Sequence, residues 1–188
     1  MEQREWPRSQ KELNAGAIKV RVAALDQIFN PMDPTTLEER SLNQEVADWI
    51  EEWAEDLGGD KPLTIEIHVI DGNVDGRRDA VASGLHNHFE YREWQESREL
   101  KKLWREGRIS LAIGLTALTV FISLSHLIGT SKNPVLDVVH EGLTVIGWVS
   151  MWKPLQIFLY EWWPVRRERE ACRRLAEAEV TFRSVNPR

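Results

Sequence analysis

The stretch ISLAIGLTALTVFISLSHLIG, residues 109 to 129, decides how this chain can fold, because its 21 residues include no formal charge. A helix rises about 1.5 Å per residue, so the stretch makes roughly 31 Å of helix, enough to cross a bilayer core of about 30 Å. Four bases come just before it: Lys101, Lys102, Arg105 and Arg108. We therefore predict a membrane-spanning helix over residues 109–129.

A second apolar segment covers residues 142–163 and could begin as early as Val135. The dipeptide Lys153-Pro154 lies near its middle. Proline removes a backbone donor and kinks a helix, so the freed carbonyls need partners from a neighbouring helix or from water. Together the two segments predict a two-helix transmembrane hairpin over residues 109–163.

The distribution of bases predicts the orientation of this hairpin. Bases flank its two outer ends, before residue 109 and at Arg166, Arg167 and Arg169, whereas Lys132 is the only Lys or Arg in the connecting loop. Cytoplasmic loops of membrane proteins carry an excess of Lys and Arg. We therefore expect both termini in the cytoplasm of a bacterial cell, with the hairpin in its inner membrane. The start of the chain, MEQREWPRSQKELN, is polar and lacks the features of a removable signal peptide.

Outside the apolar segments, the periodicity changes several times. Alternation predicts strands over 17–22, 63–70 and 179–185, and i, i+3, i+4 spacing predicts helices over 42–57, from 78 into the first span, and over 165–178. We expect an α+β fold, in which both chain ends form a small cytoplasmic domain interrupted by the hairpin. The expected parts are a mobile arm (1–16), an α+β domain (17–108), the hairpin (109–163) and a basic helix with a closing strand (164–188).

Three sequence features carry a resemblance: the turn IFNPMDP followed by LEERSL at 37–42, the segment WKPLQIFLYEWWPVRRERE at 152–170, and the strand after it. With them, the chain resembles an uncharacterised group of small bacterial inner-membrane proteins. The resemblance covers residues 17 to 185. It implies the membrane architecture and assigns no catalytic residue.

Polar residues inside the apolar segments are the candidate functional positions. Lys153 and Gln156 could line a pore, or the lysine stem could lift its ammonium group to the lipid headgroups. His126, His140 and Glu141 fall at similar depth in an antiparallel hairpin and could form a proton-accepting or metal-binding cluster. They lack the spacing of a known metal site, so we interpret them as residues that end the spans.

Other positions predict packing and anchoring. Ser110 and Gly114 form a small-xxx-small pair that Ala117 extends, a pattern that lets helices approach closely. Trp162, Trp163, Arg166 and Arg167 are expected to anchor the second span at the interface. The acidic helix around Trp49 and Trp53 could dock on the basic helix after Arg166.

Several classes of function find no support in the sequence. It contains no Gly-rich phosphate loop, no GxSxG, no HExxH and no CxxC, and Cys172 is its only cysteine. We therefore predict no enzyme activity, no cofactor and no metal. No basic face with interleaved aromatics predicts a nucleic-acid partner. The expected function is an oligomer-forming or accessory scaffold, alone or in a larger membrane complex; the alternative is an oligomeric ion or solute conduit lined by the second span.

Overall fold

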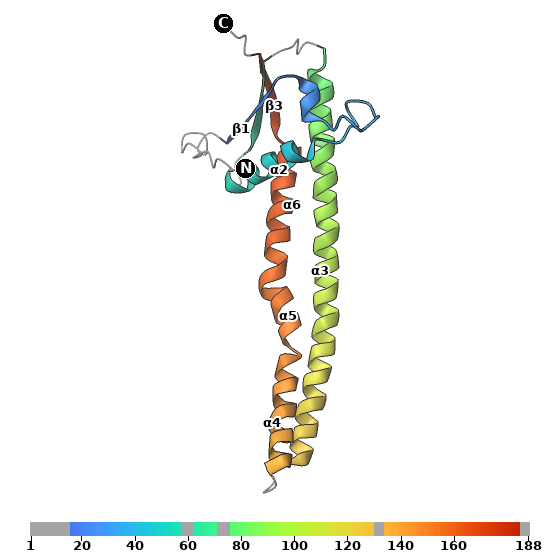
Figure 1. Cartoon of the computed structure of the whole chain (residues 1–188), viewed down its shortest axis with the longest axis vertical. Coiled ribbons are helices and arrows are strands. Elements are labelled where there is room, and N and C mark those ends of the chain that lie inside the picture. Colours follow the sequence, from blue (N-terminus) through green and yellow to red (C-terminus); the bar gives the residue numbers. More distant parts are fainter. Residues whose placement is uncertain (1–15, 58–61, 71–75, 130–133, 185–188) are drawn as a thin grey trace. The chain divides into compact units, whose positions relative to one another are not determined.

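A computed structural model describes residues 16–57, 62–70, 76–129 and 134–184 of the chain (Figure 1). The chain forms two compact units, which we call the sheet unit (Met1–Glu96 with Arg167–Arg188) and the helical unit (Ser97–Arg166). The predicted arm over residues 1–16 lies, except for Gly16, outside the described residues. Helices and strands are both present, so the mixed fold class is confirmed.

The sheet unit contains a three-stranded sheet of β1 (Ala17–Val22), β2 (Thr64–Val69) and β3 (Glu179–Ser184). Both pairings are parallel, in the order β1-β2-β3, and Ile18 aligns with Ile65, which aligns with Val180. Parallel neighbours need long crossover connections. The short 3₁₀-helix η1 (Leu25–Ile28) and the helix α2 (Gln44–Leu57) lie in the first connection, and the helices from α3 to α6 lie in the second. The three predicted strands are therefore confirmed, and their parallel order is a new finding.

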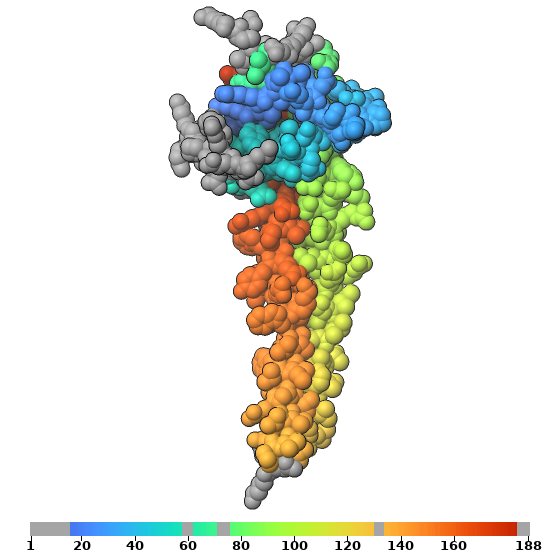
Figure 2. Space-filling view, in the orientation of Figure 1, coloured from blue at the N-terminus to red at the C-terminus, as the bar shows by residue number. Residues whose placement is uncertain are grey.

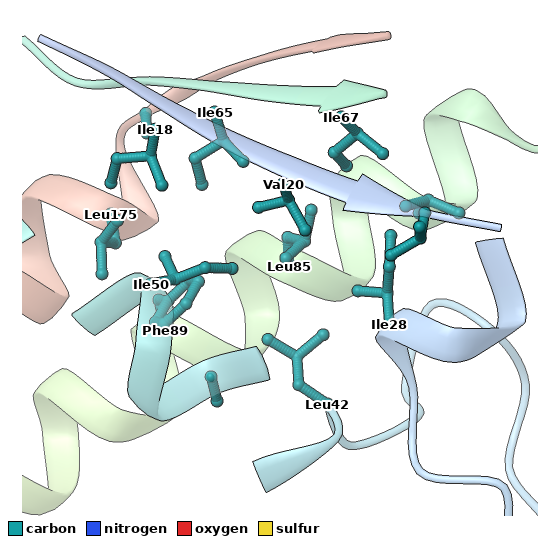
Figure 3. Close-up of a cluster of buried hydrophobic side chains, with 14 of the residues drawn as sticks. Ile18, Val20, Ile28, Leu42, Ile50, Ile65, Ile67, Leu85, Phe89 and Leu175 are labelled. Atoms are coloured by element: carbon teal, nitrogen blue, oxygen red, sulfur yellow. The ribbon is translucent and has the colours of Figure 1, made fainter. Parts of the chain in front are cut away.

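The core of the sheet unit lies between the sheet and its helices. Figure 3 shows Ile18, Val20, Ile65 and Ile67 facing Leu85 and Phe89 of α3 (Arg78–Ile128), with Ile50 of α2 and Leu175 of α6 (Trp162–Ala176) beside them. Every one of these side chains is buried. Full burial of such a side chain contributes about 1.5–3 kcal/mol relative to exposure. Alternate strand residues thus supply one half of the core and the helices supply the other.

The loop after the short helix η1 (Leu25–Ile28) is organised by Asp33. Its carboxylate accepts hydrogen bonds from the backbone and hydroxyl groups of Ser41 and Thr35, at 2.7–3.1 Å. These bonds favour the charged form, so the pKa of Asp33 lies well below its ordinary value. The loop contacts α3 at Gly84, where an added Cβ would lie 2.7 Å from the Leu37 carbonyl oxygen.

Polar contacts join the helices of the sheet unit to one another and to the residues before β3. Arg92 makes a two-point ion pair with Glu51, with Nε–Oε1 at 3.0 Å and Nη2–Oε2 at 2.9 Å. Arg174 of α6 donates to the Ala54 carbonyl of α2 at 3.2 Å. His86 Nε2 lies 2.9 Å from the Ala178 carbonyl oxygen. The acidic helix and the basic helix therefore meet, through a backbone carbonyl.

The helical unit contains the second part of α3, then α4 (Pro134–Val149), α5 (Trp152–Gln156), the π-helical turn η2 (Ile157–Glu161) and the start of α6. The helix predicted over 142–163 is thus divided rather than continuous. Pro154 is the third residue of α5 and has no N–H to donate to the preceding turn, which explains a break at Ser150 and Met151. Among the described helices, α3 alone is long and apolar enough to cross a membrane.

Candidate functional site

The candidate site is the contact between the apolar part of α3 and the segments α4, α5 and η2, which lie beside it in both views (Figures 1 and 2). Glycines allow the two segments to approach each other closely. A Cβ added to Gly107 would lie 3.0 Å from Ile157 Cγ2, and one added to Gly114 would lie 2.8 Å from the Ser150 carbonyl oxygen. At Gly147 of α4, the nearest atom is Leu118 Cδ1 at 3.3 Å. Residue numbers rise on α3 as they fall on the segment that packs against it, residues 134–161, which we call the partner segment. The two segments are therefore antiparallel.

Hydroxyl groups connect the same two segments. Ser125 is buried; its Oγ donates to the His140 carbonyl oxygen at 3.0 Å and also lies 3.0 Å from Thr144 Oγ1. Ser150 Oγ lies 3.2 Å from the Gly114 carbonyl oxygen and 2.6 Å from that of Gly147. These contacts give hydrogen-bond partners to the hydroxyl groups of an otherwise apolar helix pair.

Lys153 forms an ion pair that reasoning from the sequence missed. Its Nζ lies 2.9 Å from Glu161 Oε1; the lysine side chain is 59% exposed and that of Glu161 is 28% exposed. The two residues are eight positions apart, and Glu161 is the last residue of the π-helical turn. The i, i+4 rule does not link such positions, so spacing gave no signal of the contact. Gln156 is exposed on α5.

The other predicted polar positions do not form a cluster. His126 and Glu141 are exposed, and His140 is half-buried. In the part of the chain that the structure describes, no group of three His, Cys, Asp or Glu side chains is arranged to hold a metal ion. In this part of the helix pair, the groups in contact are the hydroxyl groups of Ser125 and Thr144 and the backbone carbonyl of His140, and not the two imidazole rings.

The predicted packing positions fall on different parts of α3. Gly114 is buried against Ser150 and Met151 of the partner segment. Ser110 and Ala117 are half-buried, and the packed face instead continues to Leu118, Phe121 and Ser125. The spacing 107, 114, 118, 121, 125 follows the a and d positions of a heptad. The three-residue pattern read from the sequence therefore overlaps this face at Gly114.

Aromatic side chains gather at the base-rich end of the helical unit. Trp104 lies 5.6 Å from Phe158 and 6.3 Å from Trp162, measured between ring centroids. Trp162 is 5.5 Å from Trp163, its Nε1 donates to the Phe158 carbonyl at 2.8 Å, and the Arg166 guanidinium lies 5.8 Å from its ring. Arg167 is exposed. We did not predict Trp104 as an anchor from the sequence, because it lies on α3 and the predicted anchors follow the second apolar segment. Its place five residues before Ile109 was nevertheless a usable signal.

A second group of titratable residues surrounds Cys172 in the sheet unit. Burial, together with the nearby Glu51 carboxylate, raises the pKa of the Cys172 thiol to about 12. The hydrogen bond to Glu51 raises the pKa of Arg92, and burial lowers the pKa of His88. A thiol held in its neutral form is a poor nucleophile and a poor metal ligand. We interpret this group as part of the core rather than as a reactive site.

The chain was compared with protein-family models, with curated proteins and with solved structures, and none of them matches. The resemblance to small inner-membrane proteins therefore stays a prediction. The assignment of function rests on the helix pair itself.

Proposed function

We propose that this protein is an integral protein of the bacterial inner membrane, crossing it as a two-helix hairpin with both termini in the cytoplasm. The exposure of the apolar part of α3 carries this proposal. Only 11% of its most apolar 18-residue window is buried, whereas a helix of this composition in a soluble core would be covered. Lipid is the solvent that suits such a surface.

The second crossing is supported by the surface of the partner segment. Large apolar side chains of α4 are exposed, among them Val138, Val145, Ile146 and Trp148. The 16 residues of α4 make about 24 Å of helix, so α5 and η2 are needed to complete a crossing. The hydroxyl groups at Ser125 and Ser150 give the pair internal partners for its polar groups. These features favour a hairpin over a surface helix.

Within the membrane, we propose a non-enzymatic scaffold that forms oligomers or joins a larger membrane complex. The Lys153–Glu161 pair supports a scaffold over a conduit, because an ion pair carries no net charge with which to select an ion. The sheet unit, built from both ends of the chain, would present the cytoplasmic contact surface.

Cysteine accessibility tests the topology. In a Cys172→Ala background, single cysteines would replace Glu38 and Pro134, both of which are exposed. In intact cells that express the full chain, an impermeant maleimide should label the cysteine at 134 and spare the one at 38. Both should be labelled after permeabilisation, which serves as the control. Labelling of position 38 in intact cells would contradict the proposed orientation.

A further inference from the structure

We infer that one face of α3, just before its apolar part, binds the phosphate headgroup of an anionic phospholipid; this rests on the proposed membrane crossing. Arg98, Lys101, Lys102 and Arg105, with Glu99, line an open hollow of about 600 Å³. The four bases have i, i+3, i+4, i+7 spacing, which places them on the same face of a helix. With the one acid, the lining carries three net positive charges.

Three bases of this face, Lys101, Lys102 and Arg105, are exposed to a ligand. Lys101 and Arg105 are exposed, and no residue that the structure describes forms an ion pair with either of them. Lys102 forms a long ion pair with Glu106, in which Nζ lies 3.9 Å from Oε1. Both side chains are exposed. Exposed pairs of this kind contribute little, so a phosphate group can compete for the lysine.

The face continues from bases into exposed apolar side chains. Ile109 follows Arg105 by four residues, Ile113 follows four later and Val120 seven after that; they are 54%, 64% and 55% exposed. Gly107 and Gly114, which contact the partner segment, lie about half a turn away, on the opposite side of α3. Cations above an unpacked apolar stripe match a phospholipid, whose acyl chain would follow the stripe beneath its headgroup.

The same cations could instead bind free phosphate, so the apolar stripe is what commits the site to lipid. Basic clusters next to the cytoplasmic end of a membrane helix attract anionic headgroups, with about 1 kcal/mol for each Lys or Arg near the surface. That free energy corresponds to roughly a fivefold preference per cation. We therefore expect several cations together to give at least a fivefold preference for an anionic lipid.

Electron spin resonance on the reconstituted full chain tests the site. The protein would be placed in phosphatidylcholine bilayers with a trace of spin-labelled phosphatidylglycerol or phosphatidylcholine, and the immobilised fraction of each label compared. Wild type should favour phosphatidylglycerol about fivefold or more, and 1 M NaCl should reduce the preference by screening. The variant Lys101→Gln, Lys102→Gln, Arg105→Gln should reduce it toward one. A control that removes three exposed arginines of the sheet unit, Arg77→Gln, Arg173→Gln, Arg183→Gln, should keep it.

The possible results separate the two proposals. Protein that alkaline carbonate strips from phosphatidylcholine vesicles would overturn the membrane crossing and this inference with it. Protein that is retained but shows equal immobilisation of the two lipids would overturn the inference alone. Displacement by inorganic phosphate, beyond that by chloride at equal ionic strength, would assign the hollow to free phosphate and overturn the lipid assignment. Loss of the preference in the control variant would show that net charge, not this face, creates it.

Discussion

At Gly114 the backbone of α3 approaches its partner too closely for any side chain. A Cβ there would lie 2.8 Å from the Ser150 carbonyl oxygen, a backbone atom that cannot turn aside. Gly114→Ala should therefore separate the two segments and reduce the free energy of unfolding by about 1–3 kcal/mol. Thermal denaturation in detergent, followed by circular dichroism, measures the change.

Gly142 offers a matched control for this substitution. It lies in α4, and nothing lies within 4 Å of a Cβ added there. Gly142→Ala should leave the melting temperature unchanged or raise it, since alanine stabilises a helix by up to about 1 kcal/mol over glycine. Equal loss of stability in both variants would contradict close packing at Gly114.

Cys172 makes stability depend on pH in the alkaline range. The pKa of its thiol is about 12 in the folded protein, against an ordinary value near 9. Above pH 9 the unfolded chain releases this proton while the folded chain keeps it. Proton release lowers the free energy of the unfolded state, so the free energy of unfolding decreases as the pH rises. The fall is at most about 1.4 kcal/mol per pH unit and ends when the pH reaches the folded pKa.

Melting temperatures at pH 8 and pH 10.5 test the role of Cys172. Between pH 8 and pH 10.5, the melting temperature of the wild type should decrease more than that of Cys172→Ala, because the other groups titrate equally in both proteins. The alanine variant removes a buried side chain and will start lower at pH 8, which leaves the difference between pH values interpretable. If both proteins lose the same amount, burial of the thiol does not raise its pKa.

Among the elements, β3 decides whether the sheet unit is complete. It pairs with β2 along its length, and its Val180 and Phe182 pack against the core. A chain that ends after Ala176 loses this pairing and also the Ala178 carbonyl that contacts His86. We expect it to lose roughly 2–4 kcal/mol of stability, from the burial of two apolar side chains.

Protease resistance and thermal denaturation of the truncated chain measure this loss. A chain that ends after Ser184 is the control, since it keeps β3 and should match wild type. Identical melting of the two truncated chains would mean that β3 contributes nothing to the fold.

The same elements show how far the sequence alone leads. Period-two alternation placed the ends of β1, β2 and β3 to within about one residue, because half-buried strands leave that pattern. Hydrophobic periodicity likewise placed α2 and the passage of α3 into its apolar part. It did not predict the division of the second apolar segment into α4, α5 and η2, although Pro154 marked a kink there. Average hydropathy is insensitive to such backbone detail.

At the scale of the whole molecule, the scaffold and the conduit predict different behaviour of Lys153. In a scaffold, Lys153→Met leaves Glu161 without its partner and should weaken the packing of α3 against residues 134–161, and adding Glu161→Gln should restore that packing. In a conduit, both variants should change ion preference. Ion flux into liposomes that contain the full chain, compared with empty liposomes, measures the difference.

The mass of the detergent-extracted particle completes this test. Two segments from one copy cannot enclose a pore, so a conduit requires a closed ring of many copies. We expect a small oligomer with no flux above empty liposomes in either variant. A ring whose ion selectivity changes with Lys153→Met would contradict the scaffold proposal.

The sequence by itself determined which residues avoid water, because charge and hydropathy are properties of each residue and its neighbours along the chain. From these came the strands, the long apolar helix and the expected membrane orientation. The tertiary structure decided which residues meet: Lys153 with Glu161, Ser125 with the backbone of His140, and Arg92 with Glu51. These contacts depend on helix rotation, on the π-helical turn and on packing between distant segments, and none of the three leaves a periodic signal in one sequence.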